Sequence, residues 1–206
     1  AIANPYKFEG VVANLGALSQ NTRLNVEAFD DIGTSVFSST SNDTMLFTMD
    51  TNIFVTNNTF TPTNTGMFDF YTWSTSDSTG TDTISTSSIV TDSIMGRDFN
   101  DYQSYWRVGR SCGGMVLGAY YDIYDTDDLT SISAYISPIS VPGAQIYAVV
   151  FEIDAAGGTK IWLTQSDDHM IQSADLDNWV TFEIPGGINL LAGTTYMAAI
   201  GGYAHP

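Results

Sequence analysis

Basic residues and cysteine are scarce in this sequence. Of its 206 residues only 6 are Lys or Arg, against 23 Asp or Glu, and the formal net charge is −17. Binding to nucleic acid needs clustered Lys and Arg, so the composition argues against a nucleic-acid partner. A strongly anionic surface also disfavours adsorption to anionic membranes. The single cysteine, Cys112, excludes a disulfide framework within the chain and any site built from several cysteines.

Long apolar runs and helix-forming residues are also lacking. No run approaches the roughly 20 residues of a membrane-spanning helix, and we expect no membrane insertion. Glu and Lys are few, whereas Asp, Asn, Ser, Thr and Gly are abundant. These polar residues favour turns, and Thr, Tyr, Phe and Val favour strands. The composition therefore predicts a folded all-β protein, and it is typical of secreted proteins, so we expect an extracellular or cell-surface location.

Alternation of apolar and polar residues predicts the strands of the first half. In Arg23–Phe29 every second residue is apolar, which places Leu24, Val26 and Ala28 on one face of a half-buried strand. Further strands are expected at 35–37, 44–49, 67–73 and 88–94. The stretch from Ser74 to Ser88, rich in Ser, Thr, Asp and Gly, is expected to be an exposed hairpin loop.

The second half is richer in Ile, Tyr and Gly, and a short polar segment separates it from the first. We place the boundary near residues 92–98, which gives two β-sandwich modules, residues 1–95 and 96–206. The apolar stretch Gln145–Ile153 predicts a central strand covered on both faces. Turns are expected at 141–143, 155–158 and 185–187, and the only candidate helix is the short segment Asp167–Leu176. Strands are expected near 102–108, 114–124, 129–137, 144–153, 160–165, 179–184 and 195–203.

Each half contains a glycine turn directly before an aromatic residue that begins a strand: Gly66-Met67-Phe68 and Gly193-Thr194-Thr195-Tyr196. In immunoglobulin-like sandwiches an aromatic at this place fills the corner between the sheets, and a tyrosine hydroxyl bonds back to the backbone. Tyr196 has the hydroxyl for this bond, whereas Phe68 can only pack. An ordinary turn followed by a core aromatic is the alternative interpretation.

The motifs of both halves resemble a known family. The first half, with Val12–Gly16, Leu24–Phe29 and Phe60-Thr61-Pro62, resembles the immunoglobulin-like modules of proteins exported by the type IX secretion system of Bacteroidota. The second half, with Val90–Asp98, Val141–Ile146 and Leu190–Tyr196, resembles the jelly-roll modules that follow them. The resemblance implies an immunoglobulin-like sandwich followed by a jelly-roll-like one. It also implies export, surface attachment and a non-catalytic role in adhesion, gliding or scaffold building.

The same resemblance implies O-glycosylation. The sequence signal in Bacteroidota is Asp, then Ser or Thr, then an apolar residue or Thr. Four segments match it, and their acceptor residues are Thr44, Ser78, Thr83 and Ser93. A pattern this short also arises by chance in a chain rich in Asp, Ser and Thr.

Residues able to carry catalysis are few. His169 follows two aspartates, but no Gly-x-Ser-x-Gly segment presents a nucleophile to it, and His205 lies one residue from the last one. Cys112 is flanked by Arg110, which favours a thiolate, but has no evident base beside it. Glu152 and Asp154 share one face of an expected strand, as a pair of glycosidase carboxylates would, although a solvated turn explains them equally. We expect no enzyme activity.

Calcium binding is the more plausible chemistry. Asp122, Asp125, Asp127 and Asp128 lie within seven residues, and oxygen-rich loops are what calcium prefers. The segment lacks the glycine and distal glutamate of an EF-hand loop, so this specific motif is absent. A solvated acidic turn is the alternative interpretation.

Carbohydrate binding is the alternative function. Jelly rolls hold sugars on aromatic platforms, and the chain offers several aromatics that would serve, although we expect most to be core or half-buried. The candidates are Trp73, Trp106, Trp162, Trp179, Tyr102, Tyr105, Tyr120, Tyr121 and Tyr124. A polysaccharide is therefore one candidate partner.

Other copies of the chain, or further domains of the same protein, are the remaining candidate partners. A jelly roll has eight strands, and the sequence predicts about seven in the second half, so its last strand is expected to be missing. Unpaired strand edges are templates for another chain. Either the sequence is a fragment of a larger secreted adhesin, or a neighbouring subunit completes the module and builds a filament or surface layer.

Overall fold

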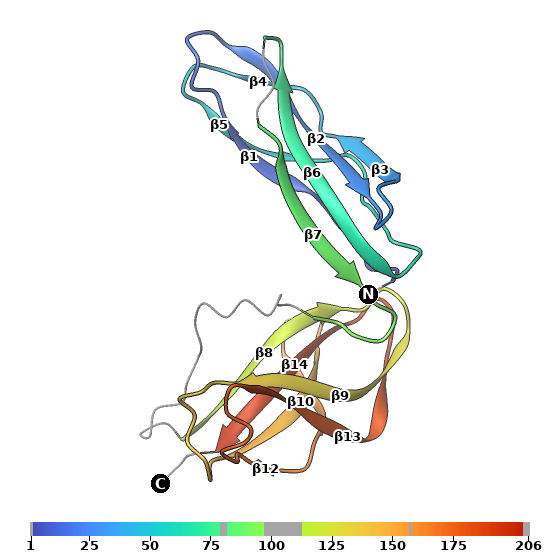
Figure 1. The fold of residues 1–206 in the computed structure, drawn as a ribbon, viewed down its shortest axis with the longest axis vertical. Helices are drawn as coiled ribbons and strands as arrows, with labels where there is room; N and C mark the ends of the chain where they lie inside the picture. The colour runs from blue at the N-terminus through green and yellow to red at the C-terminus, as the bar shows by residue number, and fades with distance from the viewer. Residues whose placement is uncertain (1, 79–81, 97–112, 157, 204–206) are drawn as a thin grey trace. The chain divides into compact units, whose positions relative to one another are not determined.

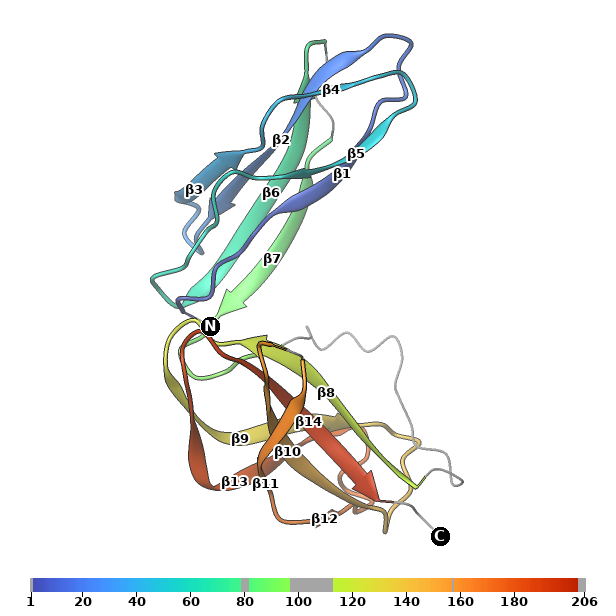
Figure 2. The ribbon, with the colours of Figure 1, turned by 180° about the vertical axis from the view of Figure 1, so that it is seen from behind.

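The computed structural model describes residues 2–78, 82–96, 113–156 and 158–203 (Figures 1 and 2). The chain divides into two compact units, Ala1–Met95 and Gly96–Pro206. Within the described ranges the regular structure consists of antiparallel strands without a helix. The predicted fold class, an all-β chain of two β-sandwich modules, is confirmed. In the same ranges there is accordingly no helix long and apolar enough to cross a membrane.

The first unit contains a two-stranded sheet, β1-β5, and a larger sheet in the order β3-β2-β6-β7, with β4 also paired to β2. Its strands are β1 (Glu9–Ala13), β2 (Gln20–Phe29), β3 (Ser35–Thr40), β4 (Thr44–Leu46), β5 (Thr51–Val55), β6 (Gly66–Ser76) and β7 (Ile84–Val90). Strands β2 and β6 are the longest of the unit and lie at the centre of the larger sheet (Figure 1). They form the rigid surface on which the candidate site lies.

The core of the first unit is aromatic. Leu24, Val26 and Ala28 are buried on one face of β2, as the alternation predicts. Phe68 and Phe70 of β6 join Phe60 in a cluster, and neighbouring rings in it have centroids 5.1–6.1 Å apart, a separation at which aromatic pairs attract. A second cluster of Leu24, Leu46 and Phe54 joins β2, β4 and β5, so it links the two sheets of the sandwich.

Two sequence expectations for the first unit are wrong in extent. The exposed loop expected from Ser74 to Ser88 is shorter, because β6 continues to Ser76 and β7 begins at Ile84. Residues 85–88 are Ser and Thr, as suits β7, an edge strand with mostly exposed side chains. The strand expected over 44–49 ends at Leu46; Asp50 then closes a turn in which its Oδ2 accepts a hydrogen bond from the backbone N–H of Phe47 (3.2 Å).

The second unit contains a sheet in the order β11-β10-β14-β8, with β12 also paired to β10, and a two-stranded sheet β9-β13. Its strands are β8 (Gly114–Asp122), β9 (Asp127–Ile136), β10 (Gln145–Ile153), β11 (Lys160–Gln165), β12 (His169–Met170), β13 (Asn178–Leu190) and β14 (Thr195–Tyr203). Apart from β12, which the sequence does not predict, these lie where strands are expected between 114 and 203, although β13 continues past the expected 179–184 to Leu190. The strand expected at 102–108 lies outside the described residues.

Strand β10 is the centre of the larger sheet of the second unit. It pairs with β14 along its whole length and with β11 and β12 on its other side. Three consecutive residues, Ala148, Val149 and Val150, are buried, so side chains on both faces of the strand are covered. The prediction of a central strand covered on both faces is confirmed.

The glycine turn before β14 has the structure that the sequence predicts. The hydroxyl of Tyr196, which is buried, accepts a hydrogen bond from the backbone N–H of Leu191 (3.1 Å). Gly193 has a φ of 80°, a conformation that glycine adopts without strain. The corner is therefore closed by one side chain that fills the core and also satisfies a backbone donor. Phe68 at the start of β6 is buried in the aromatic cluster, as expected.

Two expectations for the second unit are wrong. The candidate helix at 167–176 is replaced by β12 and turns, because the backbone of His169 and Met170 pairs with β10. The turn expected at Pro185–Gly187 is a bulge inside the continuous strand β13, where the pairing with β9 shifts between Glu183 and Ile188. Gly186 and Gly187 have φ values of 77° and 63°, which is the backbone freedom that such a bulge uses.

Candidate ligand-binding face of the first unit

The candidate site lies on the outer face of the β3-β2-β6-β7 sheet. Side chains alternate along a strand, so Asn25, Glu27 and Phe29 of β2 point away from the core, opposite to Leu24, Val26 and Ala28. In the strand register Asn25 pairs with Trp73, Glu27 with Tyr71, and Phe29 with Asp69. Three rows of outward side chains therefore cross the sheet, about 6.6 Å apart along each strand.

Serine and threonine residues extend these rows onto the edge strands. On β3, Thr40 pairs with Asn25, Ser38 with Glu27 and Ser35 with Phe29. On β7, Ser85 pairs with Tyr71 and Ser87 with Asp69. The face therefore has an aromatic centre with hydroxyl groups on both sides.

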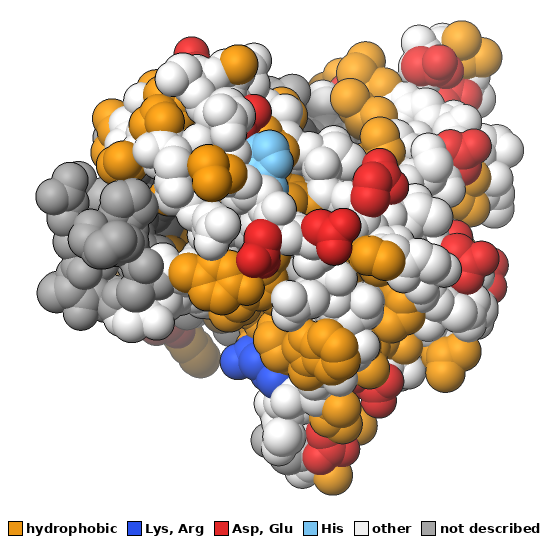
Figure 3. Space-filling view, turned by 90° about the horizontal axis from the view of Figure 1, so that it is seen from below, with side chains coloured by type: hydrophobic (Ala, Val, Ile, Leu, Met, Phe, Trp, Pro, Cys, Tyr) orange, Lys and Arg blue, Asp and Glu red, His pale blue; other side chains and the backbone are white. Residues whose placement is uncertain are grey.

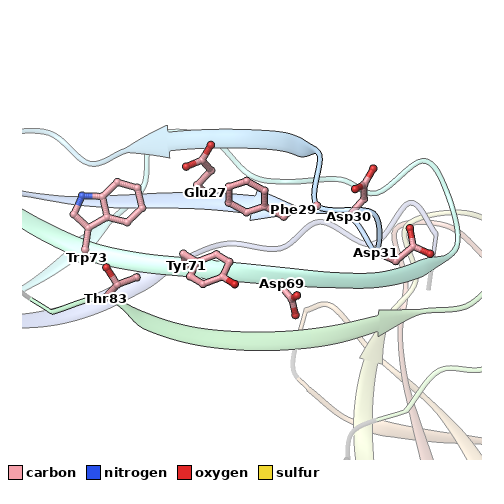
Figure 4. Close-up of a pocket in the computed structure, with 9 residues that line it drawn as sticks. Glu27, Phe29, Asp30, Asp31, Asp69, Tyr71, Trp73 and Thr83 are labelled. Carbon is pink, nitrogen blue, oxygen red and sulfur yellow. The ribbon is translucent and has the colours of Figure 1, made fainter.

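Three aromatic rings from two strands form this centre (Figure 4). The rings of Phe29 and Tyr71 have centroids 5.5 Å apart and are nearly perpendicular, a favourable edge-to-face pair. Tyr71 is 37 % exposed, and Phe29 and Trp73 are half-buried. The Phe29–Tyr71 contact therefore leaves both rings partly open to solvent, and Trp73 is partly exposed on the same surface.

Carboxylates surround the rings. Glu27, Asp30, Asp31 and Asp69 line the same shallow, open depression of about 620 Å³, together with Phe29, Gly33, Tyr71, Trp73 and Thr83. Glu27 Oε1 accepts a hydrogen bond from Ser35 Oγ (2.7 Å), and Asp69 Oδ1 accepts one from Ser87 Oγ (2.6 Å). These bonds fix the carboxylates at the edges of the aromatic centre, as Figure 4 shows for Glu27 on one side and Asp69 on the other.

A second depression of about 350 Å³ adjoins the first across Trp73, which lines both. Its lining is neutral and polar: Asn25, Val26, Ser38, Ser39, Thr40, Asn57, Asn58 and Trp73. Asn25 is only 9 % exposed, and its Nδ2 donates to the backbone carbonyl of Trp73 (3.3 Å) and to Thr75 Oγ1 (3.2 Å). These two bonds hold the strand that carries the indole.

The carboxamide oxygen of Asn25 can still accept a hydrogen bond. Its Oδ1 accepts no hydrogen bond from the residues that the structure describes. Every fully buried side-chain oxygen and nitrogen among these residues has a partner, so this oxygen reaches the surface. Because Asn25 lines the second depression, its oxygen is available there to a ligand that can donate a hydrogen bond.

Exposed rings beside hydroxyl, amide and carboxylate groups suit one kind of ligand chemistry. The apolar C–H face of a sugar ring packs on an aromatic ring, and its hydroxyls bond to the polar groups around it. Trp73 is among the aromatics that the sequence predicts as sugar platforms, whereas Phe29, Tyr71 and the carboxylates are not. Their shared face depends on the register between β2 and β6, whose paired residues lie forty or more positions apart in the sequence.

The four aspartates of the expected calcium site lie around the turn between β8 and β9. Asp122 Oδ1 accepts a bond from Thr195 Oγ1 (2.6 Å), and Asp128 Oδ1 accepts one from Asn189 Nδ2 (2.9 Å). Asp125 and Asp127 each accept from the backbone N–H of the next residue. Among the described residues no group of three or more metal-ligating side chains converges. The calcium site stays a prediction: chelator should then lower the melting temperature, and added calcium should raise it.

The expected glycosylation residues lie on the first unit. Ser78, Thr83 and Ser93 are exposed, and Thr44 is half-buried in β4. Ser78 Oγ donates to Gln20 Oε1 (2.9 Å), and Thr83 lines the aromatic depression. A glycan on Thr83 would therefore lie at the rim of the candidate site.

Among the described residues, the candidate catalytic side chains of His169 and Asp154 form hydrogen bonds with neighbours other than one another. His169 contacts Asp175 (Nε2 to Oδ2, 2.8 Å) rather than the aspartates that precede it. Asp154 Oδ1 accepts from the N–H of Ala156 (3.2 Å), so it stabilises the turn after β10. Glu152 lies within β10, between its partners on β11 and β14. Cys112 and His205 lie outside the described residues.

Hydrogen bonding shifts two pKa values in the second unit. The backbone N–H of Gln172 and the His169 ring both bond to Asp175, and they lower the pKa of its carboxyl. Tyr203 donates its hydroxyl proton to Asp168 (3.0 Å), which raises the pKa of Tyr203. Each shift is explained by a local bond at the surface, so neither indicates a catalytic group.

The other candidate aromatics are dispersed over the second unit. Trp162 on β11 is 57 % exposed and Trp179 on β13 is 44 % exposed, so the expectation that most of these aromatics are core or half-buried is wrong for both. They lie on different sheets. Tyr120 and Tyr124 are exposed, and Tyr121 is half-buried. Trp106, Tyr102 and Tyr105 lie outside the described residues.

Comparison with known protein families finds no family that matches the chain, and comparison with curated proteins finds no matching sequence.

Proposed function

We propose that the chain is a non-catalytic adhesion protein of the cell exterior, which binds polysaccharide through the outer face of the β3-β2-β6-β7 sheet. The observation that carries this proposal is the group of Phe29, Tyr71 and Trp73 on a solvent-facing sheet surface, with carboxylate, hydroxyl and amide groups around it. Exposed apolar surface that is concentrated in one place and rimmed by polar groups is characteristic of binding sites.

A purely structural role for the aromatic residues explains less. Cross-strand aromatic pairs stabilise a sheet by up to about 1 kcal/mol, and the Phe29–Tyr71 pair contributes in this way. Trp73 pairs instead with Asn25, and it lies where the two depressions meet. Stabilisation of the sheet requires neither the depressions nor the row of hydroxyls beside them, whereas binding of a sugar chain uses both.

Substitution of the central tryptophan tests the proposal. The full chain is titrated with soluble polysaccharides by isothermal calorimetry and by affinity gel electrophoresis. Base stacking shows that one aromatic platform contributes about 1–3 kcal/mol, so Trp73→Ala is expected to weaken binding by roughly fivefold or more. Phe47→Ala, which removes a more exposed aromatic of the same unit outside the depressions, is the control and should bind as the wild type does. Equal binding by both variants contradicts the proposal.

Assembly with further copies is a second candidate function, and strand β11 favours it. β11 is an edge strand of its sheet, and the consecutive residues Ile161 and Trp162 are 47 % and 57 % exposed. Consecutive side chains lie on opposite faces of a strand, so this edge is apolar on both faces. Figure 3 shows apolar side chains interspersed with carboxylates and few basic groups.

An apolar edge with open backbone groups is a template for strand pairing. If β11 pairs with another copy, sedimentation velocity should show concentration-dependent species. Ile161→Lys, which places a charge on the edge, should leave a monomer. Ile32→Lys, at an exposed turn residue of the first unit, is the matched control. A monomeric wild-type chain at all concentrations contradicts the assembly.

A further inference from the structure

The two depressions on either side of Trp73 differ in charge. The first has four carboxylates in its lining and neither Lys nor Arg; the second is lined by side chains without charge. In the described part of the first unit the basic residues are Lys7 and Arg23, and neither lines a depression. Arg23 lies 3.9 Å from Asp43 instead. The negative charge of the first depression is therefore not balanced by a cation of its own lining.

The carboxylates keep oxygen atoms available. Glu27 and Asp69 each use one oxygen to accept from a serine hydroxyl, and the other oxygen has no donor among the described residues. Asp30 differs, because its Oδ1 accepts from the backbone N–H groups of Ile32 (3.2 Å) and Thr34 (2.7 Å) and so shapes the β2–β3 turn. Glu27 Oε2 and Asp69 Oδ2 thus flank the Phe29–Tyr71 pair as acceptors that carry charge.

The neutral depression supplies a different set of groups. Asn25 offers its carboxamide oxygen, although the residue is 91 % buried, and the exposed Ser38 and Thr40 add hydroxyls. From Phe29 to Asn25 the strand advances about 13 Å, which is longer than a single sugar ring. A ligand that uses both depressions is therefore a chain of sugars rather than a monosaccharide.

We propose that the two depressions together bind an amino-sugar polymer. Its protonated amines would contact Glu27 and Asp69 in the first depression, and its neutral sugar groups would lie on Trp73 and in the second depression. The inference rests on the proposed polysaccharide function and names its substrate class. An ammonium group donates up to three hydrogen bonds and carries the charge that the first depression lacks. A polymer of uronic acids or sulfated sugars would instead be repelled by the four carboxylates.

The test compares three oligosaccharides of matched length and linkage: glucosamine, N-acetylglucosamine and glucose oligomers. Calorimetric titration of the full chain should give the highest affinity for the glucosamine oligomer. Its affinity should fall as salt rises, because exposed ion pairs are screened. It should fall again as the pH rises past the pKa of the amine, because the ligand then loses its positive charge.

A double variant isolates the charge. Glu27→Gln/Asp69→Asn should weaken binding of the glucosamine oligomer by about threefold to tenfold, as expected for two exposed ion pairs. Binding of the glucose oligomer should stay unchanged. Glu9→Gln/Asp92→Asn makes the same change of charge at exposed positions of the first unit outside both depressions. This control should bind as the wild type does, and circular dichroism melting confirms that both variants are folded.

The outcomes separate the two proposals. Binding of all three oligomers with equal affinity, lost in Trp73→Ala, overturns the amino-sugar inference and keeps the polysaccharide function. The inference is also overturned if Glu9→Gln/Asp92→Asn weakens glucosamine binding as much as Glu27→Gln/Asp69→Asn does. The oligomer is then attracted by the net charge of the protein and not by the first depression. No binding of any oligomer overturns both.

Discussion

The two units use similar aromatic residues in different ways. In the first unit Phe29, Tyr71 and Trp73 gather on one face of one sheet, because β2 and β6 pair in the register that aligns them. In the second unit the exposed Trp162 and Trp179 lie on strands of different sheets. Both units are antiparallel sandwiches with polar loops, so fold class alone does not create a binding face. The binding face of the first unit comes from the register between its two long strands, β2 and β6.

The cores differ as well. The first unit is held by clustered phenylalanines around Phe70, whereas the buried residues of β10 and β14 in the second are mostly aliphatic, such as Val149 and Met197. A change in one core should therefore leave the other untouched if each unit folds on its own hydrophobic core.

Phe70→Ala should destabilise the first unit by about 3–5 kcal/mol, because it leaves a cavity among the rings of Tyr6, Phe8 and Phe60. Differential scanning calorimetry should then show one transition moved to a lower temperature, while the second unit unfolds where it does in the wild type. A single transition that shifts as a whole would contradict the independence of the two cores.

Gly201→Ala should destabilise the second unit by about 1–3 kcal/mol. A Cβ at this position would lie 2.2 Å from Cζ of Tyr147, whose ring covers the glycine, so the ring must move. Gly202→Ala is the matched control, because its Cβ meets only Ile146 Cγ2, at 3.7 Å. Chemical denaturation should separate the two variants; equal stability would show that the Tyr147 ring relocates without cost.

Much of this architecture could be predicted from the sequence, because alternation is a local signal. Alternation predicts β2, the continuous apolar run predicts β10, and the glycine turn before Tyr196 predicts a hydrogen bond that the structure contains. Edge elements are harder to predict. The Ser- and Thr-rich start of β7 is typical of a loop, and the segment that contains β12 is the candidate helix. Pairing with a neighbouring strand decides the structure of both segments, and a local pattern does not reveal it.

The candidate site was less predictable than the fold. Trp73 is a candidate by residue type, whereas nothing local in the sequence distinguishes Glu27 and Asp69 from the other acidic residues. Their importance comes from lying in adjacent rows beside Tyr71 and Phe29, which only the pairing of β2 with β6 establishes. Conversely, the dense aspartates near residue 125 stood out in the sequence, yet each has a hydrogen-bond donor from its own surroundings.

Tyr196→Phe should cost about 0.5–1.5 kcal/mol, because the N–H of Leu191 loses the hydroxyl that accepts its hydrogen bond. The ring itself stays in place, so the variant isolates the bond from the packing. Tyr124→Phe, at an exposed tyrosine of the same unit, should change the free energy of unfolding by less than about 0.5 kcal/mol. If both variants unfold at the same denaturant concentration, the corner bond contributes nothing to stability.

Asp175→Asn should have the smallest effect, and the effect should depend on pH. Bonds from Gln172 N–H and His169 lower the pKa of Asp175 below 3.8 in the folded chain. A depressed carboxyl pKa stabilises the fold above the unfolded pKa, and this stabilisation is lost as the pH falls through the folded value. The variant should therefore melt slightly below the wild type at neutral pH and converge with it in acid. A difference that persists at the acid end would mean that Asp175 acts through its shape, because the charge is no longer present there.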